Sequence, residues 1–290
     1  DKTQRWLATQ QNRLLPTHYF LVTFTLPSGM RPVARSSQKI IYNRLFQASS
    51  RALQKLAKDP RFVGGDIGMM GGLHTWTRDM RYHPHVHYIV PGGGLSSDRS
   101  QWLPSGKKFF VPVEALSEIF RAKFRDALKK TDLFDDVPPD VWKKDWVVHC
   151  KPVGSGDNAV KYLAPYIDRV AITNNRIEAL ENDKVIFRFK NSETGQWERT
   201  TLPAFDFMHR FLQHVLPKGF VKIRSYGFMA PGKRNLLAAA LYLLGALTPL
   251  SVAPLASEKP HVCPCCGSLL RWVKPLGEAT RAPPLRKRCA

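Results

Sequence analysis

The sequence predicts an α+β protein built on a mainly antiparallel β-sheet. Three observations lead to this fold class: alternating stretches rich in β-branched and aromatic residues, longer stretches with apolar residues three and four apart, and an irregular order of the two kinds along the chain. With 290 residues, of which 43% are hydrophobic, the chain can bury a substantial core. A disordered basic protein is therefore excluded.

The first half of the chain is expected to contain four strands and two helices. The strands are short and rich in β-forming residues, and turn-prone residues follow the first of them. The helices carry an apolar stripe at a spacing of three and four. We expect the strands over residues 19–26, 66–76, 85–90 and 109–113, and the helices over residues 35–58 and 116–128.

The second half begins with an exposed loop, because residues 131–140 carry four Asp, two Pro and no base. Asp157 is a suitable N-cap for the helix that follows the next strand and loop. Turn residues at two later places predict β-hairpins. The expected elements are a strand over 146–150, a loop over 151–156, a helix over 157–168, hairpins over 170–202 and a helix over 203–215.

The chain is strongly basic, with 44 Lys and Arg against 23 Asp and Glu and a net charge of +21. A folded, aromatic-rich chain with this excess favours a polyanion partner, with nucleic acid ahead of a membrane surface. Residues 218–290 hold twelve bases and two acids. We therefore expect a domain over 1–216 and a basic C-terminal region, with a helix and a Cys-rich tail, over 217–290.

The cysteines and the hydropathy pattern indicate a soluble, reduced, cytoplasmic protein without a membrane anchor. The five cysteines are odd in number, which does not suit a secreted disulfide framework. The longest apolar window, residues 236–247, is shorter than the roughly 20 residues that a membrane span needs. Since the chain begins at Asp1 rather than Met, we expect a trimmed start.

The segment His83-Pro84-His85-Val86-His87 is the most informative one. Side chains two apart on a strand point to the same face, so His85 and His87 present two imidazoles side by side. A hydrogen-bonded surface cluster is the alternative, but three of nine histidines within five residues favour a metal site. Imidazole prefers Mn, Zn, Cu or Ni to Mg, while a phosphate substrate would also allow weak Mg²⁺ or Mn²⁺ binding.

Two tyrosines, Tyr162 and Tyr166, are four residues apart and therefore share one face of the expected helix. Core packing with satisfied hydroxyls is the alternative. Lys161 and Arg169 lie beside them, and Asn158, a candidate metal ligand, is one turn ahead of Tyr162. A phenol becomes a useful nucleophile when a metal and cationic groups stabilise the phenolate and the reacting phosphate.

The stretches HPHVHYIVPGGGLS and YLAPYIDRVAITNNR together resemble the two-tyrosine rolling-circle transposases of the insertion sequence 91 type, members of the HUH (His-hydrophobic-His) nuclease superfamily. FLVTFTLPSGMRP, LHTW, FRFK and FLQHVLPKGFVKIRSYGF extend the resemblance over most of residues 19–228. It implies an HUH-type antiparallel sheet flanked by helices. It also implies a metal-dependent enzyme, using Mg²⁺ or Mn²⁺, that cleaves and transfers single-stranded DNA through a 5′-phosphotyrosine intermediate.

By this resemblance His85 and His87 bind the metal, and Tyr162 and Tyr166 are the nucleophiles. The family often has Gln where this chain has Asn158, so the third ligand is open between Asn158 and two other histidines, His83 and His74. We also expect Lys161 and Arg169 to contact DNA, Pro165 to kink the helix, and the protein to associate with the bacterial nucleoid. A Cys-rich segment, expected to bind zinc, precedes this region in the family.

The C-terminal tail contains Cys263-x-x-Cys266, which is half of a structural zinc site. His261 and Cys289 are the other local candidates, and free thiols are an equally good interpretation. The stretch from Gly227 to Arg234 imitates a phosphate-binding loop, but it ends in Arg where Mg²⁺ coordination needs Ser or Thr. We therefore reject an ATP site.

Two other functional classes remain open. A zinc hydrolase would use the histidine cluster with a bound water, and its tyrosines would be dispensable. A non-catalytic DNA-binding module would depend on charge alone, and neither set of residues would matter.

Overall fold

The computed structural model describes residues 2–163, 171–191, 193–246, 265, 266 and 268. The chain divides into two compact units, Asp1–Ala246 and Leu247–Ala290. Every helix and strand identified among the described residues belongs to the first unit. The expected division after residue 216 stays a prediction about domain organisation.

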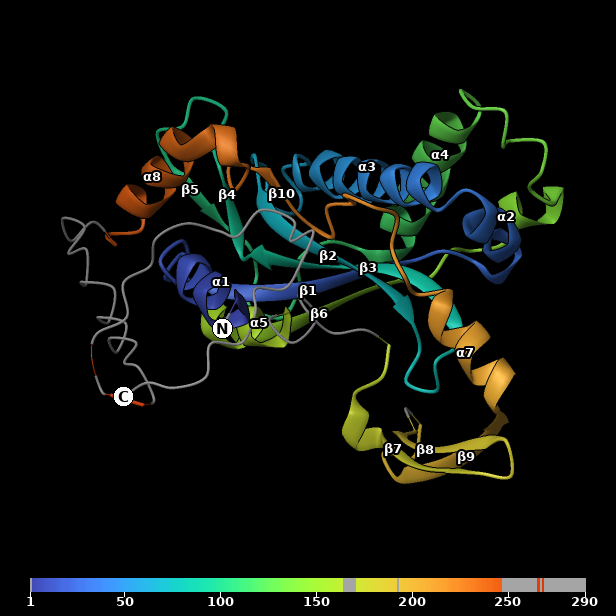
Figure 1. The fold of residues 1–290 in the computed structure, drawn as a ribbon. Coiled ribbons are helices and arrows are strands. Elements are labelled where there is room, and N and C mark those ends of the chain that lie inside the picture. Colours follow the sequence, from blue (N-terminus) through green and yellow to red (C-terminus); the bar gives the residue numbers. More distant parts are fainter. Residues whose placement is uncertain (1, 164–170, 192, 247–264, 267, 269–290) are drawn as a thin grey trace. The chain divides into compact units, whose positions relative to one another are not determined.

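A five-stranded sheet forms the centre of the first unit (Figure 1). Its strand order is β10-β2-β3-β1-β6, and each neighbouring pair is antiparallel. A separate antiparallel pair, β4 and β5, follows β3. The strands are β1 (His18–Thr25), β2 (Gly68–Trp76), β3 (Tyr82–Pro91), β4 (Gly93–Leu95), β5 (Trp102–Pro104), β6 (Val148–Ser155) and β10 (Ile223–Gly227). The predicted α+β class with a mainly antiparallel sheet is confirmed.

Helices α2 (Arg31–Ser36), α3 (Gln38–Ala57) and α4 (Val113–Leu128) are the long connections between these strands, and α3 and α4 cover one face of the sheet (Figure 1). Their apolar stripes pack with alternate strand residues into the main core. The ring of Phe120 lies 5.0 Å from that of Phe24 and 5.0 Å from that of Trp146. Because side chains alternate along β1, those on its other face contact different neighbours.

Two shorter helices, α1 (Lys2–Gln11) and α5 (Gly156–Leu163), lie on the opposite face of the sheet (Figure 1). Sequence reasoning did not foresee α1. A second apolar cluster joins α5 to three strands, and its fully buried members are Tyr19, Leu21, Met70, Ile89, Ala159 and Val160. The sheet is thus covered by helices on both sides, with α5 fixed to the face opposite α3 and α4.

The hairpins predicted over residues 170–202 are confirmed as a three-stranded antiparallel sheet, β7 (Ile177–Glu181), β8 (Lys184–Lys190) and β9 (Trp197–Pro203). Asn182 and Asp183 form the first turn with φ of 48° and 57°, as a two-residue hairpin with the favoured twist requires. Helix α7 (Ala204–Leu212) follows, and the ring of Phe207 packs 5.6 Å from that of Phe187. A last helix, α8, spans Arg234–Leu243.

Two expectations about local structure were wrong. Residues 109–113 are not a strand: Phe110 and Val111 are buried in the main core as irregular chain, and Pro112 precedes α4. Residues 151–155 are not a loop but the second half of β6. Because β6 is an edge strand, Pro152 removes no hydrogen bond that a further strand would need.

Strand β10, which lies beyond Pro217, was not predicted, and it pairs with β2 from Ile223↔Gly72 to Gly227↔Gly68. This pairing brings the start of the basic C-terminal part into the main sheet. None of the helices that the structure describes is both long enough and apolar enough to cross a bilayer.

We expect Phe120→Ala to lower the free energy of unfolding by about 3 to 5 kcal/mol, because it removes a ring that is buried between Phe24 and Trp146 and leaves a cavity. Urea denaturation followed by circular dichroism measures the change. Phe205→Ala is the matched control, since Phe205 is 73% exposed. Equal midpoints for the two variants would contradict this view of the core.

Candidate metal centre

Three histidines from two neighbouring strands meet on the sheet face that carries α5. His85 and His87 alternate along β3, and His74 of β2 lies directly opposite His85. One ligand nitrogen from each of the three lies within 4.8 Å of the others. The ring of His74 is 4.5 Å from that of His87, an approach that is helped by Gly72, the partner of His87, which has no side chain.

Hydrogen bonds orient two of these rings. The Nδ1–H of His85 donates to the carbonyl oxygen of His83 at 2.6 Å, which leaves its Nε2 lone pair for a ligand. The Nδ1 of His87 lies 2.8 Å from the hydroxyl oxygen of Thr23. Metal-binding histidines commonly have one ring nitrogen fixed in this way by a carbonyl or another polar group.

The surroundings keep all three imidazoles uncharged near neutral pH. Burial is the first cause in each case: it lowers the pKa of His85 to about 4 and holds the pKa of His74 and His87 well below the usual value. The imidazole of His85 and then Lys151 lower the pKa of His87 further, and the two neighbouring imidazoles and Lys222 do so at His74. Neutral imidazole is the form that binds a metal, so the donor set fits a divalent ion of the Mn or Zn type.

The structure brings His74, rather than Asn158 or His83, to the predicted pair. His83 lies on the same face of β3, but its Nδ1 is 3.2 Å from a guanidinium nitrogen of Arg31. Asn158 is exposed on α5, and a Cβ built on Gly154 would lie 3.8 Å from its amide nitrogen. Gly154 pairs with Tyr19, which lies four residues, or about 13 Å, before Thr23 along β1. Asn158 is therefore distant from the histidines beside Thr23.

An open cavity of about 580 Å³ is lined by His85 and His87 of the cluster. It follows β1, β3 and β6, where Thr23 pairs with His87 on one side and with His149 on the other. Its lining residues are Leu21, Thr23, Thr25, His83, His85, His87, Val113, Val147, Val148, His149, Cys150 and Lys151. His85 and His87 therefore face a space that an external ligand can enter.

Helix α5, which carries the first predicted tyrosine, lies on this same face. Its Ala159 and Val160 pack on Leu21 and Ile89, whose positions are two residues from Thr23 and His87 on their strands. Lys161 is exposed on α5, and Tyr162 lies within its last turn, although the position of its side chain is outside the described structure. Tyr166 and Arg169 also lie outside the described residues.

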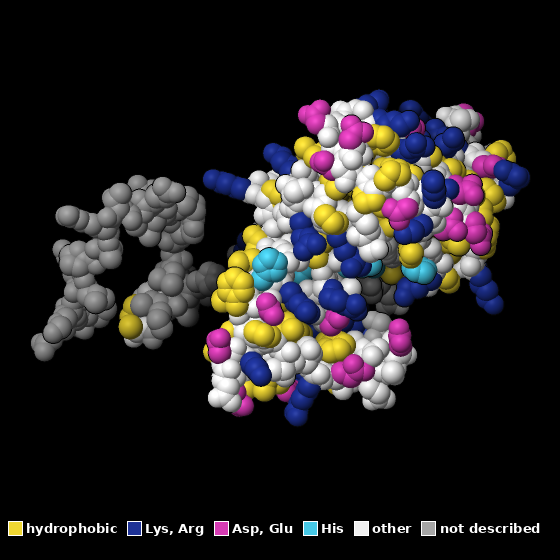
Figure 2. Space-filling model, turned by 90° about the vertical axis from the view of Figure 1, so that its right-hand side faces the viewer, with side chains coloured by type: hydrophobic (Ala, Val, Ile, Leu, Met, Phe, Trp, Pro, Cys, Tyr) yellow, Lys and Arg dark blue, Asp and Glu magenta, His cyan; other side chains and the backbone are white. Residues whose placement is uncertain are grey.

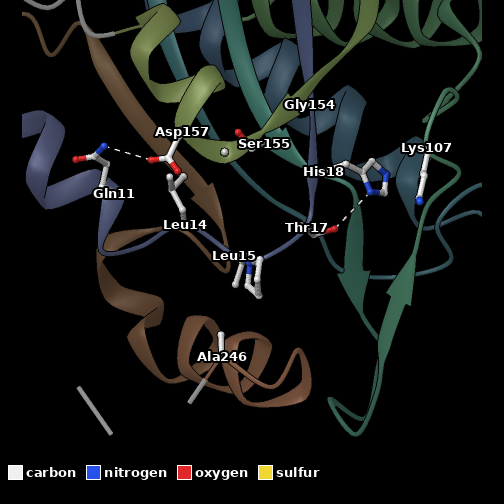
Figure 3. A pocket seen from close by; sticks show the side chains of 12 residues that line it. Gln11, Leu14, Leu15, Thr17, His18, Lys107, Gly154, Ser155, Asp157 and Ala246 are labelled. Carbon is white, nitrogen blue, oxygen red and sulfur yellow. Dashed lines mark hydrogen bonds between the residues drawn. The ribbon is translucent and has the colours of Figure 1, made fainter. Parts of the chain in front are cut away.

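A larger cavity, of about 840 Å³, lies at the start of α5, between α1 and the beginning of β1 (Figure 3). Several of its polar side chains are hydrogen-bonded within the protein. The Nε2 of His18 is 3.2 Å from the hydroxyl of Ser105, and the amide of Gln11 donates to Asp157 at 3.2 Å. This cavity is bigger than the histidine cavity, but the described residues that line it offer no comparable set of metal ligands.

Part of the expected zinc site lies within the second unit. Cys265 and Cys266 are exposed there, and the thiol of Cys266 lies 3.5 Å from the hydroxyl of Ser268. Cys263, His261 and Cys289 lie outside the described residues.

Comparison with known proteins assigns the chain to a family. Residues 68–236 match the Y2_Tnp family model, described as "Putative transposase". The chain is 37% identical over 277 residues to "Putative transposase y4qJ" of Sinorhizobium fredii, a match that covers 88% of this chain and 69% of that protein. The chain belongs to the Y2_Tnp transposase family. The resemblance to transposases of the insertion sequence 91 type is thereby confirmed.

A second relative of this Y2_Tnp protein is the "Transposase for insertion sequence element IS801" of Pseudomonas savastanoi pv. phaseolicola. It is 28% identical over 309 residues, which covers 96% of this chain and 73% of that protein. No solved structure matches the chain. Family membership makes the protein a DNA-processing enzyme with DNA as its substrate, in agreement with its net charge of +21.

We expect His74→Ala to weaken Mn²⁺ binding by more than about 100-fold, because it removes one of three nitrogen ligands, whereas loss of an outer partner alone costs roughly 10- to 100-fold. Isothermal titration calorimetry measures the affinity. Mn²⁺ is the chosen metal because thiols, such as those of the tail, bind it weakly. His209→Ala, at an exposed histidine of α7, is the control. An unchanged affinity for His74→Ala would remove His74 from the site.

The depressed pKa of His85 predicts a loss of stability in mild acid. An unfolded histidine titrates near pH ~6.5, whereas the folded one titrates at about 4. Between these values the unfolded chain binds more protons, so the free energy of unfolding falls as the pH falls through this window. Urea titrations at several pH values should give a shallower pH slope for His85→Asn than for the wild type. Identical slopes would contradict the pKa shift.

Proposed function

We propose that this transposase is a metal-dependent, HUH-type single-stranded DNA nuclease and strand transferase that acts through a 5′-phosphotyrosine intermediate. One observation carries the proposal: the three-histidine cluster and the helix that contains Tyr162 lie on the same face of the sheet. Had α5 packed against the α3–α4 face, the sheet itself would separate the phenol from the imidazoles.

The residue roles follow from this arrangement. His74, His85 and His87 hold the metal, so the third position, left open by the sequence, goes to His74. When bound, a divalent metal supplies Lewis-acid polarisation of the scissile phosphate and stabilises the departing oxygen. Three imidazoles without a carboxylate favour Mn²⁺ over Mg²⁺.

In the proposed reaction the hydroxyl oxygen of one tyrosine, Tyr162 or Tyr166, forms a bond to phosphorus, and the bond from phosphorus to the 3′ oxygen breaks. The phenolic proton leaves, and the 3′ oxygen takes up a proton to become a free hydroxyl. The covalent link preserves the free energy of the phosphodiester, so rejoining needs no nucleoside triphosphate. A second tyrosine permits a second cleavage before the first is resolved, as rolling-circle transposition requires.

Several remaining assignments belong to the same proposal. Lys161, exposed on α5, and Arg169 contact the phosphates of single-stranded DNA at the transposon ends and the target. Cys263 and Cys266 contribute to a structural zinc site, and the protein works at the bacterial nucleoid. The division into a catalytic domain, 1–216, and a basic C-terminal region, 217–290, also belongs here.

A second candidate is a zinc-dependent hydrolase, which the three-histidine donor set favours. Three protein ligands with an open fourth position are typical of catalytic zinc sites that activate a water molecule. Such an enzyme would cleave DNA without becoming attached to it, and Tyr162 and Tyr166 would have no part in cleavage.

We expect the wild type, incubated with single-stranded oligonucleotides from candidate element ends and Mn²⁺, to form a covalent protein–DNA adduct that survives denaturing electrophoresis. Tyr162→Phe or Tyr166→Phe should reduce the adduct, because each removes one nucleophile. His85→Ala combined with His87→Ala should abolish it, because the metal loses two of its ligands.

Tyr242→Phe is the matched control, since Tyr242 is 68% exposed on α8 and outside the proposed site. It should form as much adduct as the wild type. Cleavage by the wild type with no adduct would favour the hydrolase, and DNA binding without cleavage would favour a non-catalytic module.

A further inference from the structure

Arg31 holds an unusual position beside the histidine cluster. It is the first residue of α2, and one of its terminal guanidinium nitrogens donates to the Nδ1 of His83 at 3.2 Å. His83 shares the face of β3 with His85, and their ring centroids are 5.3 Å apart. The imidazole of His83 thus lies between the guanidinium of Arg31 and the proposed metal ligands.

The charge of Arg31 is not balanced within the described part of the chain. None of the carboxylates described there lies within ion-pair distance of it. Its Nε is shielded from solvent and has no hydrogen-bond acceptor among the residues that the structure describes, while the side chain as a whole remains partly exposed. A partly desolvated cation without a counter-ion is costly, so the site is suited to an anion that arrives from outside.

Neighbouring groups increase this imbalance. Burial lowers the pKa of Arg31, and the positive charges of Arg81 and Arg35 lower it further. Arg81 is paired with Asp79 at 2.6 Å, but Arg35 lies over the ring of Tyr82, 5.8 Å from its centroid. An exposed arginine such as Arg61, by contrast, has a carboxylate partner at 2.6 Å.

The wider surface agrees with an anionic ligand. Figure 2 shows histidine side chains across the middle of one face of the molecule, with Lys and Arg side chains beside them. A planar guanidinium presents paired N–H donors that match the oxygens of a phosphate. A DNA strand is the anion with many phosphates that the family uses.

We infer that Arg31 binds a backbone phosphate of the DNA strand that lies across the histidine face, an assignment that rests on the proposed single-stranded substrate. Arg31 would contribute its charge and its free N–H groups directly to the phosphate. The competing explanation is structural: Arg31 would only hold His83 in place, and any effect on DNA would come through His83.

Binding measurements without divalent metal separate these explanations. We expect Arg31→Gln in the full chain to weaken binding of a fluorescent single-stranded oligonucleotide about tenfold, measured by anisotropy. The slope of log K against log salt concentration should become shallower by about 0.7, the value for one phosphate contact on a single strand. Arg31→Lys should keep the wild-type slope, because it keeps the charge.

His83→Ala is the matched control, since it removes the acceptor of Arg31 and leaves the guanidinium. The proposal expects a wild-type slope for His83→Ala. If His83→Ala instead reproduced the loss seen with Arg31→Gln, the structural explanation would hold and the proposal would be overturned. Near-ultraviolet circular dichroism checks that each variant is folded. If Arg31→Gln does not fold, the salt dependence of Arg31→Lys, expected to match the wild type, is the test.

A neutral methylphosphonate placed at one position of the oligonucleotide at a time locates the contact. At one position it should weaken the wild type as much as Arg31→Gln does, with no further loss in the variant. Losses that add at every position would overturn the proposal.

These results are independent of the adduct assay. If the wild type forms adducts while Arg31→Gln keeps the wild-type slope, only the role of Arg31 fails. If no adduct forms while the slope changes as expected, the tyrosine mechanism fails and the phosphate contact stands.

Discussion

The pairing register of β2 and β3 is the constraint on which the candidate site depends. With His74 opposite His85 and Gly72 opposite His87, three imidazoles share one sheet face and their ligand atoms come within 4.8 Å of one another. A slip of one residue would turn His74 to the side of α3 and α4, because side chains alternate along a strand. The same register places Tyr88 and Val86 in the main core. Core packing and ligand geometry are therefore fixed by one set of backbone hydrogen bonds.

Burial and neighbouring positive charge act in the same direction on the histidines of this site, since both lower the histidine pKa. Burial lowers the pKa of the histidines, so their lone pairs stay available near neutral pH. Two basic side chains lie close by: Lys151, whose positive charge lowers the pKa of His87, and Arg31, which has no carboxylate partner among the described residues. Neutral nitrogen ligands bordered by positive charge can accept a metal cation together with a phosphate, since each ion offsets the cost of the other.

The sequence was sufficient for features that depend on local spacing. Two imidazoles on one face followed from His85 and His87 being two residues apart, and the turn at Asn182 and Asp183 followed from its residue types. Features that depend on pairing between distant segments of the chain could not be predicted from local spacing. His74 was a candidate ligand, but only the β2–β3 register places it opposite His85. Strand β10 and the second half of β6 escaped prediction because long-range pairing overrides weak local propensity.

Chemistry rather than cavity size identifies the site. Several polar groups that line the larger cavity, at the start of α5, have hydrogen-bond partners within the protein, such as His18 with Ser105. The smaller one is lined by His85 and His87, and the Nδ1–H of His85 donates to the His83 carbonyl, which leaves its Nε2 lone pair for a ligand. A polar group that already has its hydrogen-bond partners gains little free energy from a ligand. A desolvated group with an unused lone pair or an unbalanced charge gains much more. Such a group costs stability in the free protein, and binding of the proposed metal and of DNA would offset that cost.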